Sequence, residues 1–436
     1  MIDFTPVPEL RSVEEFTSYL DRSGIALPFD AEIETGETAP MAQPIDAGGL
    51  AVGNRWAILP LEGWDSDQEG RPTDRSLDRW RAFGRSGAKL IWGESTAVRP
   101  DGRSSPGQIL VVSSSLDGLT RMVQSANQAH RAGFDDPSDF KVGIQLTHSG
   151  RLSHPGPDGA PSPVTVRHLP HMDETGAPGS PVRMMSDDDL YELADAYVDA
   201  ATLIAEAGFD FVDLKACHGY LSHELLGAFE REGEFGGSLD NRTRFLRLII
   251  QGVRVSAPDL KLALRVSAFD TVAFNAAADG VGAPFTSDPY RFWFGTDETG
   301  HEVDLTEPIE LLSRFRDMGV DLICVTGSSP YNAWHFQRPA LSSKPGEYIT
   351  PEDPLAGVAR HIDVTRRLRD AVPGITTVGS GYSYLQQWLP NVAQAAVRRE
   401  FTDLVGIARM HLARPTFAAD VSGGVSPNGS KIGYQF

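Results

Sequence analysis

Short hydrophobic runs alternate with longer stretches of helical periodicity from about residue 50 onward. Eight of these runs are almost continuously apolar, as strands buried on both faces must be. They are RWAILPL from Arg55, KLIWGE from Lys89, KVGIQL from Lys141, FVDLK from Phe211, KLALRV from Lys261, LICVT from Leu322, TTVG from Thr376 and LVGIA from Leu404. Repeated strand and helix units predict an α/β fold, and eight of them predict a (β/α)8 TIM barrel.

The clearest predicted helix begins after Ser186 and ends at Gly208. The sequence SDDD offers an N-cap with acids in the first turn, and apolar residues then recur at helical spacing. Weaker helical patterns cover 245–255 and 309–318. We expect these helices to belong to the outer ring of the barrel.

The remaining segments suggest three parts. Residues 1–45 form an N-terminal extension with a short helix near Val13, residues 46–425 form the barrel, and residues 426–436 form a C-terminal tail. Two connections, after the third and fifth strands, are too long to be simple turns, namely 152–185 and 270–306. Long loops in a compact domain are usually functional or disordered. The second loop is rich in aromatic residues, which favours a lid or an interface.

Composition and charge exclude several classes of protein. The formal net charge is −20 and no dense Lys/Arg run occurs, which argues against nucleic acid or membrane partners. Cys217 and Cys324 are too few for a disulfide framework, a four-cysteine zinc site or an iron–sulfur cluster, and we predict no metal. The acidic, proline-containing N-terminus is unlike a signal peptide. We predict a cytoplasmic protein that acts on a small-molecule substrate, with a homo-oligomer left open.

A phosphate site is predicted where the last two strands end. Ligands of such barrels gather at the C-terminal ends of the strands. Gly379, Ser380 and Gly381 precede a helix, and Ala408 and Arg409 follow the neighbouring strand. Bare backbone N–H groups and an arginine are what a phosphate needs. A plain turn is the alternative for the G-S-G sequence alone, and its position favours the phosphate site.

Other strand ends fit a flavin. Gln145 offers a two-sided amide to the pyrimidine end of the ring, and Arg265 offers a fixed cation where negative charge gathers on reduction. Each has a structural alternative, which is a salt bridge to Asp213 for Arg265 and core hydrogen bonding for Gln145. The first two strands complete the predicted cofactor-binding set with Pro60, Leu61, Glu62 and Ser95.

Longer motifs carry a resemblance to a known family. The segment AGFDFVDLKACHGYLSHELLGAFEREGEFGGSLDNRTRFL resembles the signature of the old yellow enzyme family of NAD(P)H-dependent flavin oxidoreductases, and GIQLTHSGR resembles its third-strand motif. The segments GNRWAILPLEGWD, GESTAV and GIARMHLARP follow in family order, so the resemblance spans roughly residues 50 to 425. The fourth-strand block is specific, whereas the first-strand and seventh-strand motifs are not diagnostic separately.

The resemblance implies bound FMN, NADPH or NADH as electron donor, and hydride transfer from flavin N5 to the β-carbon of an activated alkene. It implies that Tyr220 donates the proton and that Lys215 and His218 bind the substrate oxygen. Tyr331, Trp334 and His335, together with the aromatic stretch 285–294, are candidate pocket walls, with ordinary packing as the alternative.

Two positions depart from the family pattern. The family usually has His where Lys215 stands, and a lysine would favour a carboxylate, a phenolate or a strongly charged enolate. Alternatively, Lys215 turns aside to Asp213 or Glu94. The family often has a small hydroxyl residue in place of Glu62, and an acid facing the flavin would disfavour the anionic reduced ring.

Two other functions remain open on the sequence. One is an FMN-dependent dehydrogenase or demethylase that oxidises an amine or C–H substrate. The other is a barrel that has lost redox activity and only binds a ligand. The sequence argues against this function, because the predicted site residues are all present at matching positions, namely Gln145, His218, Tyr220, Arg265 and Arg409.

Overall fold

The structure is a computed structural model that describes residues 4–134, 138–173, 182–285, 294–342 and 346–425. The predicted C-terminal tail, 426–436, lies outside the described residues, as does most of the aromatic stretch 285–294. None of the helices in the described ranges is long and apolar enough to cross a membrane.

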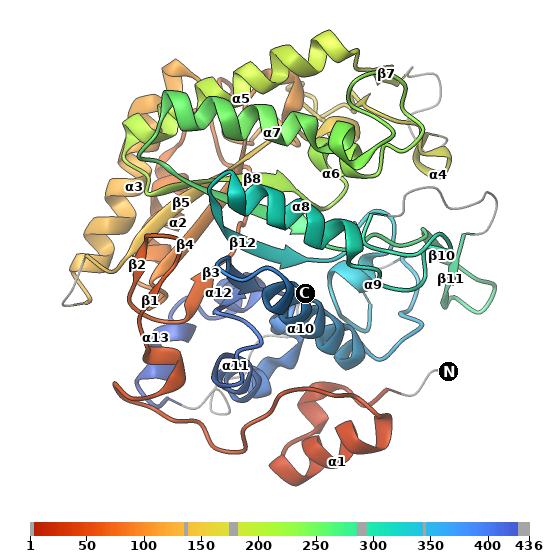
Figure 1. Cartoon of the computed structure of the whole chain (residues 1–436). Helices are drawn as coiled ribbons and strands as arrows, with labels where there is room; N and C mark the ends of the chain where they lie inside the picture. The colour runs from red at the N-terminus through yellow and green to blue at the C-terminus, as the bar shows by residue number, and fades with distance from the viewer. Residues whose placement is uncertain (1–3, 135–137, 174–181, 286–293, 343–345, 426–436) are drawn as a thin grey trace.

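Eight parallel strands close into a barrel, which confirms the predicted (β/α)8 architecture (Figure 1). Each strand pairs with the next one along the chain, and the last pairs with the first through Val405 opposite Trp56. All eight predicted runs supply a barrel strand. These strands are β3 Trp56–Ile58, β4 Leu90–Ala97, β5 Lys141–Thr147, β8 Phe211–Ala216, β9 Lys261–Ser267, β12 Val320–Thr326, β13 Thr376–Gly379 and β14 Leu404–Ile407.

Helices surround the barrel because each connection between parallel strands must cross back over the sheet. The main ones are α2 Asp74–Gly84, α3 Leu116–Arg131, α5 Asp187–Ala207, α7 Leu239–Ser256, α8 Thr306–Asp317, α10 Pro354–Ala371, α11 Leu389–Arg398 and α13 Phe417–Ser422. The predicted caps of α5 are confirmed, because Ser186 accepts a hydrogen bond from the Asp189 backbone N–H and Gly208 ends the helix with a φ of 90°. Val255, near the end of α7, is exposed rather than part of the apolar face.

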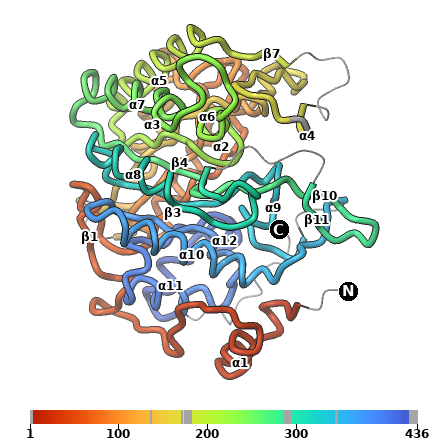
Figure 2. The backbone as a smooth tube through the Cα atoms, turned by 45° about the vertical axis from the view of Figure 1, so that its right-hand side comes forward, coloured from red at the N-terminus to blue at the C-terminus, as the bar shows by residue number. Residues whose placement is uncertain are grey.

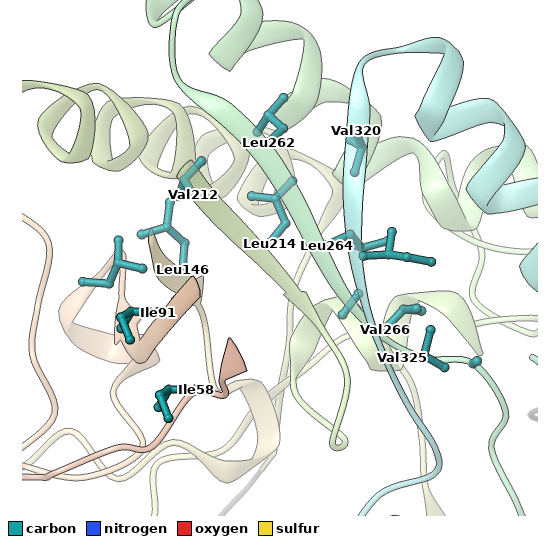
Figure 3. Close-up of a cluster of buried hydrophobic side chains, with 14 of the residues drawn as sticks. Ile58, Ile91, Leu146, Val212, Leu214, Leu262, Leu264, Val266, Val320 and Val325 are labelled. Carbon is teal, nitrogen blue, oxygen red and sulfur yellow. The ribbon is translucent and has the colours of Figure 1, made fainter. Parts of the chain in front are cut away.

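Alternation along each strand divides the core into two layers. Outward-facing residues such as Ile58, Ile91 and Val212 pack under the helices (Figure 3). Inward-facing residues such as Phe211 and Leu322 fill the lower part of the barrel. The inward layer also takes residues from the hairpin of β1 Ile45–Asp46 and β2 Ala51–Val52, which therefore covers the N-terminal end of the barrel.

Shorter elements occupy the connections at the C-terminal ends of the strands. The two long predicted loops contain α4 Pro170–Asp173 and the strand pair β6 Val164–Thr165 and β7 Arg183–Met184, and then the hairpin β10 Phe274–Ala276 and β11 Gly282–Pro284. The other short helices are α6 Leu221–Leu226, α9 Trp334–Gln337 and α12 Arg409–Ala413, with a 3₁₀ segment, η6, at Tyr382–Trp388.

The N-terminal segment packs against the last third of the chain (Figure 2). Its predicted helix is α1, Val13–Ser23, with a capping box at Ser12. The Phe16 ring stacks on Trp388 with centroids 5.1 Å apart, and Trp388 Nε1 donates to the Leu10 carbonyl at 2.8 Å. The segment is therefore anchored to the helical ring by buried aromatic contacts.

Candidate active site

Alternation along β8 and β9 directs the predicted polar residues into the barrel. Phe211 faces inward, so Asp213 and Lys215, two and four residues later, share its face. Strand pairing sets Gln145 opposite Asp213 and Lys215 opposite Arg265. Three neighbouring strands, β5, β8 and β9, thus bring these four polar side chains together at one end of the barrel interior.

Gln145 and Asp213 form a buried hydrogen bond. The Gln145 amide nitrogen donates to Asp213 Oδ2 at 2.5 Å, and both side chains are almost fully buried. Burial raises the pKa of Asp213 to about 6, and hydrogen bonds and the nearby Arg265 oppose that rise. The amide nitrogen of Gln145 is therefore used by Asp213, and the amide oxygen can accept a hydrogen bond from a ligand.

Arg265 does not pair with Asp213 as the structural alternative supposed. No carboxylate of the described residues lies within ion-pair distance of its guanidinium, and its buried Nε has no hydrogen-bond partner there. A buried donor without a partner is costly. Arg265 therefore fits a ligand that presents acceptors or negative charge.

The two predicted halves of the phosphate site are adjacent. Gly379 on β13 pairs with Val405 on β14, so the G-S-G turn lies beside the start of α12, where Arg409 stands. Gly381 has a φ of 90°, a conformation that favours glycine. The Ser380 hydroxyl donates to the Val325 carbonyl at 2.6 Å, so the donor that this residue can offer a phosphate is its backbone N–H.

Arg409 lacks a counter-charge among the described residues. No carboxylate there forms an ion pair with it, and burial together with the neighbouring Arg338 lowers its pKa to about 9. A buried arginine that has no acid beside it and a second positive charge nearby is stabilised when an anion binds to it. The residues at this end of β13 and β14 therefore fit the phosphate of FMN.

Lys215 points toward Glu62. The alternative in which it turns aside to Asp213 or Glu94 is therefore wrong. Its Nζ lies 3.4 Å from Glu62 Oε1 and 3.3 Å from Ser95 Oγ. Glu94 instead pairs with Arg79 at 2.7 Å. Burial lowers the pKa of Lys215, and the Glu62 carboxylate opposes this.

His218 follows β8 in a left-handed conformation, with a φ of 64°. Such strain in a non-glycine residue is often found at functional sites. The Gln337 amide nitrogen lies 3.2 Å from Nε2, a contact that fits the tautomer in which Nε2 accepts and Nδ1 carries the ring proton. Burial, with Arg265 and Lys215 nearby, lowers the pKa of His218 well below its usual value, so the imidazole is neutral.

Tyr220 is buried beside Lys215 and keeps its proton. The Lys215 ammonium lies 3.5 Å from the centre of the Tyr220 ring. Burial raises the pKa of the phenol well above 10, the charge of Glu62 adds to that rise, and a hydrogen bond with Ser104 opposes it. The neighbouring Tyr331 phenol also contributes to that rise.

The predicted pocket walls fall into two groups. Tyr331 is 51% exposed and reaches Tyr220, so it adjoins the predicted catalytic residues. Trp334 and His335 are buried in an aromatic cluster, where His335 Nδ1 lies 2.9 Å from the Tyr348 hydroxyl. Their role as pocket walls stays a prediction.

Sequence reasoning missed Trp64, Ser104 and Gln337. The first two donate to Glu62 Oε2, each at 2.8 Å, and the third contacts His218. Trp64 belongs to the segment GNRWAILPLEGWD, and this family resemblance is the only feature of the sequence that could have indicated it. Ser104 lies in an irregular connection and Gln337 ends the four-residue helix α9, and neither segment is long enough for periodicity to mark which side chain turns inward.

Comparison with known proteins agrees with this geometry. A model of the NADH:flavin oxidoreductase / NADH oxidase family matches residues 40–281. An NADPH dehydrogenase from Bacillus subtilis (strain 168) is 30% identical over 293 residues, which are 65% of this chain and 72% of that protein. The chain belongs to this family, the old yellow enzyme family.

Solved structures show the same fold at lower identity. The old yellow enzyme homologue from Zymomonas mobilis is 20% identical, with a TM-score of 0.61 over 88% of this chain and 92% of that one. A 2-naphthoyl-CoA reductase complex is 22% identical, with a TM-score of 0.65 over 88% of this chain. The chain spans about half, 52%, of that longer reductase.

Family membership establishes the cofactor and the class of reaction. This old yellow enzyme family member is an FMN-dependent oxidoreductase with NAD(P)H as electron donor. The turn at Gly379 to Gly381, Arg409, Arg265 and Gln145 present groups that fit such a flavin, and their role in binding it stays a prediction.

Proposed function

We propose that this flavin oxidoreductase reduces an activated alkene, such as an α,β-unsaturated carbonyl compound. In this proposal Tyr220 donates the proton, and Lys215 and His218 hold the substrate oxygen. The observation that carries it is the buried group of three at the end of β8, where the Lys215 ammonium lies 3.5 Å from the Tyr220 ring and a neutral His218 follows.

Lys215 and His218 supply donors to one oxygen. Bound FMN would supply the redox chemistry, because it accepts a hydride from NAD(P)H and passes it to an acceptor. Lys215 has a proton left after its contacts with Glu62 and Ser95, and His218 carries its proton on Nδ1. Two donors on a carbonyl oxygen stabilise the negative charge that develops when the conjugated double bond is reduced.

Tyr220 is suited to deliver the proton that completes the reduction. Its phenol stays protonated at neutral pH because burial raises its pKa well above 10. The adjacent Lys215 ammonium would stabilise the phenolate left after transfer. The neighbouring Tyr331 side chain is 51% exposed, so the phenol can be reprotonated from this side of the site.

The test is the visible spectrum of the purified protein under anaerobic conditions. We expect NADPH or NADH to bleach the flavin band and an activated alkene such as 2-cyclohexenone to restore it. A band that neither nucleotide bleaches, but that an amine substrate does, would favour a dehydrogenase. A band that is bleached but not restored by any activated alkene would contradict the proposed acceptor class.

A further inference from the structure

Glu62 is fixed in place on the side away from Lys215. Its Oε2 accepts hydrogen bonds from Trp64 Nε1 and Ser104 Oγ, both at 2.8 Å. Trp64 has a φ of 50°, a left-handed conformation at a non-glycine residue, and this turn brings its indole back to Glu62. Oε1 is left to face Lys215 at 3.4 Å.

Glu62 is also the acid that balances Lys215. Its side chain is 16% exposed and that of Lys215 is 5% exposed, so solvent screens the pair only weakly. The other acids nearby have different partners, since Glu94 pairs with Arg79 and Asp213 accepts from Gln145. Among the described residues, Glu62 is the one carboxylate within 4 Å of the Lys215 ammonium.

We propose that Glu62 determines substrate specificity, because it neutralises Lys215 and thereby selects acceptors whose oxygen is uncharged. A lysine alone at this position would favour a carboxylate. With Glu62 alongside, a carboxylate that approaches the ammonium also meets a fixed negative charge. A neutral carbonyl oxygen can still accept the remaining Lys215 proton. This inference rests on the proposed function, since it assigns the charge class of the acceptor at the same site.

The experiment measures ligand binding to the oxidised holoprotein by calorimetry, so it does not depend on turnover. Benzamide and benzoate serve as probes because they have nearly the same shape and differ in charge. Glu62→Gln keeps the size of the side chain and removes its charge. Glu69→Gln is the matched control, because it removes the same charge from an exposed position of the same loop, where Glu69 pairs with Arg71.

We expect the wild type to bind benzamide at least as tightly as benzoate. Glu62→Gln should tighten benzoate binding about 10-fold, a change of about 1.4 kcal/mol, and shift benzamide binding by less than about 3-fold. Glu69→Gln should change neither. The benzoate gain should vanish in the double variant Glu62→Gln/Lys215→Met, because the unmasked ammonium is then absent.

Three results would overturn the inference. They are a wild type that already prefers benzoate, a Glu62→Gln variant that binds benzoate no better, and a gain that persists without Lys215. If Glu62→Gln fails to fold, Glu62→Thr provides the same charge removal with a smaller side chain. Failure of the proposed function is seen separately, as reduced flavin that no activated alkene reoxidises.

Discussion

The ammonium of Lys215 lies 3.5 Å from the centre of the Tyr220 ring, with Glu62 on its other side. A cation over the face of an aromatic ring is attracted by the ring's quadrupole, by about 0.5–2 kcal/mol. The contact holds the phenol side chain in one orientation. The same charge lies over the ring into which the negative charge of a phenolate is delocalised, so one residue would both position the acid and stabilise its conjugate base.

Tyr220→Phe should slow reoxidation of the reduced flavin by an activated alkene about 10²- to 10⁴-fold. Reduction by NAD(P)H should be unaffected, since the phenol takes part only in protonation of the acceptor. Stopped-flow absorbance separates the two half-reactions. Tyr191→Phe, on the exposed face of α5, is the control. Unchanged reoxidation in Tyr220→Phe would rule out its role as the acid.

Arg409→Met should weaken FMN binding by about 10- to 100-fold, because a charge-assisted hydrogen bond contributes about 1.5–3 kcal/mol. Riboflavin lacks the phosphate, so its affinity should stay the same. Fluorescence titration of the apoprotein with each flavin checks this. If affinity for both flavins fell equally, Arg409 would support the fold instead of holding the phosphate.

Stability should decrease as the pH falls from about 6.5 to 4. Burial lowers the pKa of His335 to about 3 and those of His361 and His411 to about 4. A histidine with a depressed pKa binds its proton more readily in the unfolded chain. Its contribution to the free energy of unfolding is therefore full above about pH 6.5, and it is lost as the pH falls toward the pKa of the folded state. Asp213, with its raised pKa of about 6, acts in the opposite direction over pH 4 to 6.

Urea unfolding at several pH values measures this effect. His361→Gln should flatten the acid limb, because it removes one of the buried histidines whose pKa is lowered. The exposed His301→Gln should leave the limb as it is. An acid limb that is equally steep in both variants would show that His361 does not contribute to it.

Phe16→Ala should lower the free energy of unfolding by about 3–5 kcal/mol, as expected for a buried aromatic side chain. The ring is fully buried against Phe29 and Trp388. Denaturant unfolding, with the exposed Val255→Ala as control, provides the measurement. A loss below about 1 kcal/mol would mean that the N-terminal segment unfolds separately from the barrel.

The sequence predicts most of the barrel because each strand carries its own evidence. The eight apolar runs and the caps of α5 are local features, decided within one element. The inward direction of Gln145, Lys215 and Arg265 follows from the same two-residue alternation. These residues could be assigned to one site because parallel strands end on one side of a barrel.

The charge state of the site could not be predicted in this way. Lys215 and Glu62 are 153 positions apart, and their pairing depends on the path of an irregular turn after β3. The left-handed backbone at Trp64 and the hydrogen bond from Ser104 decide that path, and neither residue type signals it. Side-chain direction in loops is set by contacts between distant segments, which periodicity does not contain.

The docking of α1 has a consequence for the order of events during synthesis. Phe16 and the carbonyl of Leu10 find their partner in Trp388, more than 370 positions later. While the chain is being made from its N-terminus, Phe16 has only Phe29 of its two aromatic partners, and the Leu10 carbonyl lacks the Trp388 donor, until residue 388 has left the ribosome. The nascent N-terminal segment therefore stays accessible to chaperones throughout elongation, and it docks in the same late period in which β14 closes against β3.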